Sequence, residues 1–310
     1  MDISIVIPFL NESENVDFLF ESIENYLTSR TEKVEVIFVD DGSTDNSVEL
    51  LSQKQTNKFE FKIVQLSKNH GSLPALQAGI SQAKGKVTVF LYADLQDPIE
   101  LVGRLFDMYK KGFDITWACR NFAYDEKRFF SKLYAALMRK YAVDNFPENG
   151  YDVVMFTSQV RELLVANPER NSSIFLQILS LGFNQTFIYY DKQERRKGKS
   201  KWNFARKLKL VVDSFVAFSY APIRLVTIVG IVLAIVGFLW TMYIVAYTIL
   251  VGGLPLGIPA LISVSLIGFG VTNISLGIIA EYLWRTLDTS RGRKAFIIKN
   301  IIQKSRGSNE

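Results

Sequence analysis

The stretch that decides the fold is residues 87–100, which read VTVFLYADLQDPIE. Its first part is mostly apolar and rich in β-branched and aromatic side chains, which predicts a buried strand. A polar loop with Asp94, Gln96 and Asp97 follows, and Pro98 suits the first turn of a helix. Open α/β sheets bind ligands at this end of their strands, and oxygen ligands suit Mg²⁺ or Mn²⁺. Taken alone, the loop could also be a solvated acidic turn.

Strand-like and helix-like segments alternate on both sides of this stretch. Apolar runs at residues 3–8, 34–39 and 61–66 predict strands, and each is followed by a segment with helical spacing of apolar residues. Further strands are expected at residues 113–120, 153–156 and 183–189. This alternation predicts the α/β class, with a mostly parallel sheet and helices on both faces.

Three of the expected loops at strand carboxyl ends are acidic. They cover residues 8–12, 40–45 and 93–98, and none is rich in glycine. The glycine patterns of dinucleotide-binding folds and of P-loops are absent. An acidic crevice needs a cation before it can hold phosphates, so the loops favour a metal-bound nucleotide diphosphate. The single cysteine, Cys119, excludes an intrachain disulfide and a cysteine zinc cluster.

Residues 225–280 contain no charged side chain. The run fits two membrane helices of about 20 or more residues each, near residues 223–251 and 258–284, although a buried hairpin is the alternative. Arg224 precedes the first span and Arg285 follows the second, whereas the connecting loop is uncharged. By the positive-inside rule, we expect a cell (inner) membrane protein with its catalytic domain and both termini in the cytoplasm.

A basic stretch, residues 192–209, directly precedes these spans. Such a run first suggests nucleic-acid binding, but beside a membrane helix it favours anionic lipid. The amphipathic helix expected at residues 202–220 would lie in the membrane interface. We therefore expect a membrane partner and no nucleic acid. The expected organisation is a catalytic domain at residues 1–195, a juxtamembrane segment at 196–221, a transmembrane hairpin at 222–285 and a basic tail at 286–310.

Four motifs in order resemble glycosyltransferase family two, which has the GT-A fold: VIPFLNESENV, VDDGSTDNS, SKNHGSLPALQAGISQAKG and ADLQDP. The most similar subgroup contains dolichol-phosphate mannose synthase and bacterial polyprenyl-phosphate glycosyltransferases. The resemblance implies an inverting, metal-dependent transfer of one sugar from a nucleotide-diphosphate donor, such as UDP-glucose, to polyprenyl phosphate. It implies Mg²⁺ or Mn²⁺ as the cofactor. The oligomeric state, including a homo-oligomer, stays open.

The candidate site residues follow from these motifs and from charge. The expected donor-binding residues are Pro8, Glu12, Asp40, Asp41 and Asp94. The expected metal ligands are Asp94 and Gln96. The expected catalytic residues are Asp94, Asp152 and Arg195. The acceptor phosphate is expected to bind Arg120, Arg195, Arg196, Lys199, Ser200 and Lys201, because guanidinium and ammonium groups complement phosphate. For Asp152, a role in satisfying a turn is the alternative.

Two departures from the family pattern bear on activity. Many relatives read Asp-Ala-Asp where this chain has Tyr92-Ala93-Asp94. Either Asp94 with Gln96 suffices for the metal, or the protein is an inactive membrane scaffold. Processive polysaccharide synthases of the superfamily carry Gln-x-x-Arg-Trp, but Lys197 stands at the tryptophan position here. A processive synthase is therefore the second alternative.

Overall fold

The computed structural model describes residues 1–94, 96–121, 129–143, 146–147, 150–169, 173–193, 219, 221–251, 258–292 and 294–304. The chain divides into two compact units. One comprises Met1–Asp213 with Lys294–Glu310 and is built on a β-sheet. The other comprises Ser214–Arg293 and contains two long helices.

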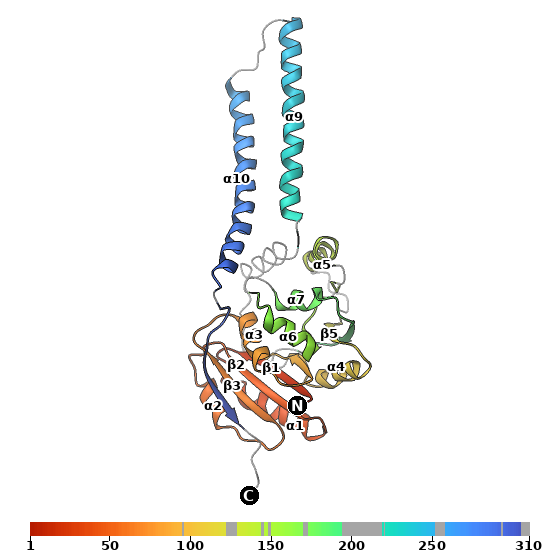
Figure 1. Ribbon diagram of the computed structural model, residues 1–310, viewed down its shortest axis with the longest axis vertical. Helices are drawn as coiled ribbons and strands as arrows, with labels where there is room; N and C mark the ends of the chain where they lie inside the picture. The colour runs from red at the N-terminus through yellow and green to blue at the C-terminus, as the bar shows by residue number, and fades with distance from the viewer. Residues whose placement is uncertain are drawn as a thin grey trace. The chain divides into compact units, whose positions relative to one another are not determined.

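The first unit is built on an eight-stranded sheet with the order β7-β5-β6-β4-β1-β2-β3-β8. Figure 1 shows β1, β2 and β3 side by side in this sheet. The parallel pairs are β1 with β2, β1 with β4, β2 with β3, and β5 with β7. In contrast, β6 and β8 run antiparallel to their neighbours. The mostly parallel sheet predicted from the sequence is thus confirmed. The strands are β1 (Ile3–Phe9), β2 (Val34–Asp40), β3 (Glu60–Leu66), β4 (Val87–Phe90), β5 (Ile115–Arg120), β6 (Val153–Thr157), β7 (Gln185–Tyr190) and β8 (Ile298–Lys304).

Helices cover both faces of the sheet because side chains alternate between the faces along each strand. Phe38 of β2 packs on Phe20 of α1, with ring centroids 6.4 Å apart, whereas the next residue, Val39, faces α3. The helices of the described part of this unit are α1 (Val16–Thr28), α2 (Ser47–Gln53), α3 (Ser72–Gln82), α4 (Leu101–Lys110), α5 (Phe129–Tyr141), α6 (Ser158–Ala166) and α7 (Ile174–Ser180).

The apolar face predicted for α1 is buried. Its members are Val16, Leu19, Phe20, Ile23 and Leu27. The ring of Phe20 also contacts the rings of Phe59 and Phe61, both at 5.4 Å between centroids. Burying a large apolar side chain stabilises a fold by roughly 1.5–3 kcal/mol. This cluster therefore anchors α1 beneath β2 and β3.

The close approach of α3 to the opposite face requires glycine at position 79. A Cβ atom on Gly79 would lie 2.2 Å from Cγ1 of Val6 and 3.0 Å from Cγ2 of Val39. Real Cβ atoms do not approach so closely, so a larger residue would push α3 away from the sheet. The glycine thus fixes α3 against the two strands that carry the expected donor loops.

β8 was not predicted from the sequence. It lies in the expected basic tail and pairs antiparallel with β3, from Lys304 opposite Phe61 to Ile298 opposite Leu66. Its isoleucine-rich sequence, AFIIKNIIQK at residues 295–304, is nevertheless a strand signal. The chain therefore returns from the second unit to the edge of the sheet.

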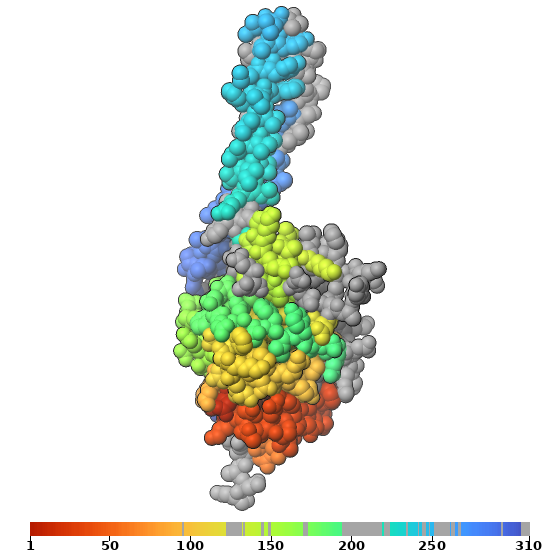
Figure 2. All heavy atoms as spheres, turned by 90° about the vertical axis from the view of Figure 1, so that its right-hand side faces the viewer, coloured from red at the N-terminus to blue at the C-terminus, as the bar shows by residue number. Residues whose placement is uncertain are grey.

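The second unit contains α9 (Ala221–Val251) and α10 (Ile258–Ser290), at the positions expected for two long helices. Many of their large apolar side chains are exposed, including Leu250 at 82% and Phe269 at 68%. Figure 2 draws the atoms of α9 in cyan to light blue. Among the residues that the structure describes, no helix combines the length and apolar character needed to cross a membrane. The prediction of two membrane-spanning helices is therefore not supported.

Candidate functional site

The loops after β1 and β2 are joined where the donor site was expected. The N–H of Asn11 donates to Oγ of Ser43, and the N–H of Glu12 donates to Oγ of Ser47, both at 2.9 Å. Asn11 has a φ of 51°, a left-handed conformation that asparagine tolerates better than most residues. Pro8 is buried within β1. The structure thus places Pro8 in the strand and Glu12 in the loop that follows it.

Asp40 and Asp41 lie at the carboxyl end of β2, and each is only 4% exposed. Oδ1 of Asp40 accepts a hydrogen bond from the N–H of Ser43 at 2.8 Å. Asp41 accepts from the N–H of His70 at 2.7 Å and from that of Gly71 at 2.9 Å. Burial raises the pKa of Asp41, against the opposing effect of these two donors. Both carboxylates therefore organise the loops around the expected nucleoside position.

The expected metal loop follows β4 and carries Asp94 and Gln96. The N–H of Gln96 lies 3.4 Å from Oδ1 of Asp94, and the carbonyl of Gln96 accepts from the N–H of Gln193 at 2.9 Å. The described residues contain no group of three or more His, Cys, Asp or Glu side chains that could hold a metal ion. Mg²⁺ is usually bound through one or two carboxylates together with substrate phosphates. Asp94 and Gln96 fit that arrangement.

Asp97, in the same loop, is 2% exposed. Its Oδ1 accepts a hydrogen bond from the hydroxyl of Tyr190 and lies 3.0 Å from Nζ of Lys192. Among the described residues, its Oδ2 is buried without a hydrogen-bond partner. Burial raises the pKa of Asp97, although the positive charge of Lys192 opposes the shift. An unpaired buried carboxylate oxygen is costly, so this position favours an added donor or cation.

Arg120 and Asp152 form a two-pronged ion pair at the same edge of the sheet. Nε and Nη2 of Arg120, the last residue of β5, donate to Oδ2 and Oδ1 of Asp152, which lies just before β6. Nζ of Lys192 lies 3.4 Å from Oδ1 of Asp152. Both oxygens of Asp152 are therefore engaged by cations. We call Asp97, Arg120, Asp152, Lys192 and the hydroxyl of Tyr190 the charged cluster.

Tyr92, which replaces the first aspartate of the family pattern, lies within the electrostatic reach of this cluster. Burial raises the pKa of its phenol, and the negative charges of Asp97, Asp152 and Asp94 raise it further. The phenol therefore stays neutral at physiological pH. The chain thus has a hydrogen-bonding group, and no additional carboxylate, at this position.

Several predicted acceptor residues lie outside the part of the chain that the structure describes. They are Arg195, Arg196, Lys199, Ser200 and Lys201. Conversely, Asp97, Tyr190 and Lys192 belong to the cluster but were not predicted as site residues. Asp97 stood in the quoted metal motif and Lys192 began the basic stretch, so their charge was a usable signal. Tyr190 gave no comparable signal.

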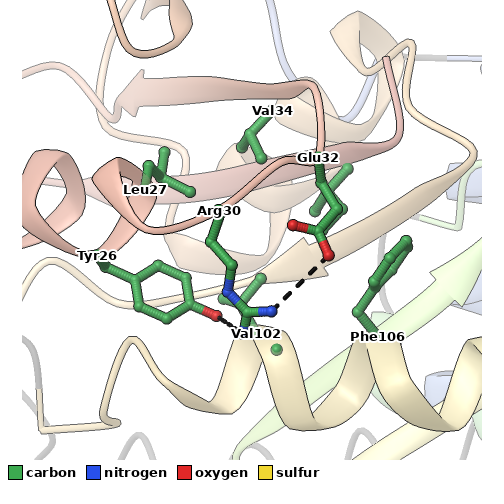
Figure 3. Close-up of a pocket in the computed structure, with 9 residues that line it drawn as sticks. Tyr26, Leu27, Arg30, Glu32, Val34, Val102 and Phe106 are labelled. Carbon is green, nitrogen blue, oxygen red and sulfur yellow. Dashed lines mark hydrogen bonds and ion pairs between the residues drawn. The ribbon is translucent and has the colours of Figure 1, made fainter.

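A small surface pocket lies at the opposite ends of the strands (Figure 3). Its lining includes Ile3 and Val34, which begin β1 and β2. Arg30 lies there, donating to the hydroxyl of Tyr26 at 2.6 Å and pairing with Glu32 at 3.7 Å. The predicted site residues lie at the other, carboxyl edge of the sheet, so this pocket is not the predicted site.

The chain matches relatives over nearly its whole length. A bactoprenol glucosyl transferase of Shigella phage SfV is 30% identical over 309 residues, which cover 98% of this chain and 100% of the relative. An undecaprenyl-phosphate 4-deoxy-4-formamido-L-arabinose transferase of Photorhabdus laumondii is 29% identical over 307 residues, which cover 97% and 94%. Both relatives are named for transfer to a prenol lipid, whereas the named sugars differ.

The fold is also similar to a solved structure and to a family model. The crystal structure of a mycobacterial protein has a TM-score of 0.51 and 18% identity, covering 69% of this chain and 74% of that chain. At this identity, the likeness concerns the fold alone. The model for glycosyl transferase family 2 matches residues 4–204, a range that includes the loops after β1 to β3, the metal loop and the charged cluster. The chain therefore belongs to glycosyl transferase family 2.

Proposed function

We propose that this glycosyltransferase moves a single sugar from a nucleotide-diphosphate sugar to a polyprenyl phosphate. UDP-glucose or a similar UDP-sugar is the proposed donor. The observation that carries the proposal is the fixed Arg120 guanidinium, held beside the metal loop by the charged cluster. The two relatives support the acceptor class, because they share a prenol lipid and not a sugar.

Arg120 can hold a phosphate without leaving its partner. A guanidinium has five N–H donors arranged in a planar fork. Among the described residues, Arg120 donates to Asp152 through Nε and Nη2, which leaves the Nη1 donors for a ligand. Its side chain is 35% exposed, so a ligand can reach it. Arginine binds phosphate oxygens in this paired geometry, and the Asp152 ion pair orients it in advance.

The acceptor needs little help from a base. A phosphate monoester has a second pKa of about 6, so a polyprenyl phosphate is already a nucleophilic anion at pH 7. The engagement of both Asp152 oxygens by Arg120 and Lys192 fits an orienting role for this carboxylate. We therefore propose that Asp152 holds Arg120 toward the acceptor and does not remove a proton.

On the donor side, Asp94 and Gln96 would hold Mg²⁺ or Mn²⁺ together with the diphosphate. The bound metal would offset negative charge on the leaving group. Asp40 and Asp41 keep the adjacent loops in place for the nucleoside, next to Pro8 and Glu12. We further propose that Arg195, Arg196, Lys199, Ser200 and Lys201 add positive charge around the acceptor phosphate. Direct displacement would invert the anomeric carbon, as the family resemblance implies.

A lipid acceptor requires the enzyme to work at a membrane surface. We propose that the protein associates with the cell membrane from its cytoplasmic side. Exposed apolar side chains on α9 and α10 support this association, because large apolar surfaces are unfavourable in water. Fractionation of cells that produce the full chain, and of cells that produce a chain lacking residues 221–292, measures this directly. Equal recovery of both chains in the aqueous fraction would contradict it.

The direct test of the activity is a product assay. Purified full-length protein is incubated with a panel of UDP- and GDP-sugars, undecaprenyl phosphate and Mn²⁺, and the lipid is analysed by mass spectrometry. We expect a mass increase of one sugar with one or a few UDP-sugars, and none with the unphosphorylated polyprenol. A ladder of sugars would indicate a processive synthase. Absence of any product with every donor would support an inactive scaffold and contradict the proposal.

A further inference from the structure

The chain that leaves β7 is attached to the metal loop by two consecutive residues. Nζ of Lys192 lies 3.0 Å from Oδ1 of Asp97, and the N–H of Gln193 donates to the carbonyl of Gln96 at 2.9 Å. The same ammonium lies 3.4 Å from Oδ1 of Asp152. One lysine thus joins three parts of the chain: the metal loop, the entry to β6 and the exit from β7.

The exit from β7 is also fixed just before Lys192. The hydroxyl of Tyr190 donates to Asp97, and the carbonyl of Tyr190 accepts from the N–H of Asn121 at 2.7 Å. Lys192 is only 17% exposed in its side chain and lies between two carboxylates that are more buried. Such a shared, shielded ion pair constrains position more than an exposed pair, which contributes little.

After Glu194, the residues that follow this attachment are strongly basic. Residues 195–201 read RRKGKSK, and they contain the residues proposed above to surround the acceptor phosphate. Gln193, the last described residue before them, and Lys192 both contact the metal loop, which carries the residues proposed to hold the donor diphosphate.

We propose that Lys192 is a positioning residue that attaches the start of this basic segment to the metal loop, so that the acceptor phosphate is held next to the donor diphosphate. The inference rests on the proposed function. It adds a role for one residue that the motifs do not indicate. Lys192 acts through its neighbours and need not touch either substrate.

The first test compares Lys192→Met with Lys192→Arg in the purified full-length protein. Methionine keeps much of the length of the side chain but removes the charge. We expect the KM for undecaprenyl phosphate to rise about 10-fold in Lys192→Met, equivalent to about 1.4 kcal/mol, with little change in the Kd of the nucleotide sugar. Lys192→Arg should restore most of the acceptor affinity. The control is Lys110→Met, which removes an exposed ion pair with Asp107 elsewhere.

A double variant separates positioning from simple charge neutralisation. If Lys192 only neutralises the buried Asp97, then Lys192→Met combined with Asp97→Asn should recover a wild-type KM for the acceptor, and the proposal is overturned. If Lys192 attaches the segment, the double variant stays impaired. Thermal unfolding of each variant shows whether the fold itself has been lost. Should Lys192→Met not fold, Lys192→Gln is measured in the same way.

Hydrogen exchange gives a readout that needs no acceptor and no activity. The N–H of Gln193 is bonded to the carbonyl of Gln96 in the attached state. Its exchange should accelerate several-fold in Lys192→Met and stay near the wild-type rate in Lys192→Arg. Unchanged exchange in Lys192→Met would overturn the attachment even if the enzyme transfers sugar as proposed. If exchange is faster in Lys192→Met but the wild-type enzyme does not use polyprenyl phosphate, the attachment stands and only the proposed function is contradicted.

Discussion

The loops after β1 to β3 and the charged cluster share one edge of the sheet but are held in different ways. In the loops, a buried carboxylate such as Asp41 accepts from backbone N–H groups of His70 and Gly71. In the cluster, the carboxylate of Asp152 accepts from the charged side chain of Arg120. Backbone donors are fixed by the fold, whereas a partly exposed guanidinium keeps further donors for a ligand. The first region therefore shapes the site, and the second supplies charge to it.

The energetic consequence follows from the kind of bond. A hydrogen bond to a charged group contributes about 1.5–3 kcal/mol, and Asp41 receives such bonds from two backbone groups. Changes in these loops should therefore affect stability together with donor binding. Changes at Arg120 should affect substrate use with smaller effects on the fold, because its side chain is 35% exposed.

The largest effect is expected for Asp94→Asn. The change is nearly isosteric but removes the charged metal ligand, so several kcal/mol of charge stabilisation should be lost. We expect activity to fall by about 100-fold or more and donor binding to lose its dependence on Mn²⁺. Asp107→Asn, on the exposed surface, is the matched control. Near-normal turnover of Asp94→Asn would contradict the metal assignment.

A smaller effect is expected for Asp152→Asn. An asparagine still accepts a hydrogen bond from Arg120 but no longer pairs with its charge. We expect a loss of about 10-fold in kcat/KM, mainly through the KM of the acceptor. The pH–rate profile should keep its shape, because Asp152 is not expected to remove a proton. A loss as large as that of Asp94→Asn, with the acidic limb of the profile removed, would identify Asp152 as a catalytic base.

Gly42→Ala tests the rigidity of the loops. Gly42 has a φ of +78°, and a Cβ there would lie 2.6 Å from the carbonyl carbon of Lys68. Gly112→Ala is a close control, since Gly112 has a φ of +94° but nothing within 4 Å of the added Cβ. The left-handed backbone alone costs about 1–2 kcal/mol. We expect Gly42→Ala to lower the Tm more than Gly112→Ala does and to weaken donor binding several-fold. Equal Tm shifts would show that the loops accommodate the Cβ at position 42 without an added loss of stability.

The smallest effect is expected at Cys119, which lies in β5 directly before Arg120 of the charged cluster. Burial raises the pKa of its thiol to about 12, so almost no thiolate exists at pH 8. We expect no measurable alkylation of the native protein and full alkylation after denaturation. Rapid labelling at pH 8 without denaturant would mean that β5 opens readily.

Much of the fold could be predicted from the sequence because it follows from local patterns. The helical spacing of Val16, Leu19 and Phe20 predicted the buried face of α1, and the alternation of strands and helices predicted the parallel sheet. β8 lies in a tail that was predicted from its charge, so its isoleucine-rich strand signal was not used. Its antiparallel pairing with β3, which is remote in sequence, has no local signal. The predicted membrane spans at α9 and α10 are not supported by the described residues.

The sequence predicted which loops form the site, but not the hydrogen bonds and ion pairs that hold their side chains. The motifs predicted that Asp40, Asp41 and Asp94 would gather at one edge, and the structure places them there. The backbone N–H groups that donate to Asp41 belong to the loop after another strand, so no side-chain pattern predicts these hydrogen bonds. The place of Lys192 likewise depends on the direction in which the chain leaves β7. Arg195 and the other basic residues predicted near the acceptor stay predictions.

The division of roles between the loops after β1 to β3 and the charged cluster is tested most directly in one pair of Arg120 variants. The KM for the lipid acceptor and the Kd for the nucleotide sugar are measured in both. Arg120→Gln removes the charge proposed to hold the acceptor phosphate, and Arg120→Lys restores charge without the planar fork. We expect the KM for undecaprenyl phosphate to rise about 10-fold or more in Arg120→Gln and less in Arg120→Lys, while calorimetry shows an unchanged Kd for the nucleotide sugar. A weakened Kd for the nucleotide sugar with an unchanged KM for the lipid would contradict the account, because Arg120 would then serve the donor.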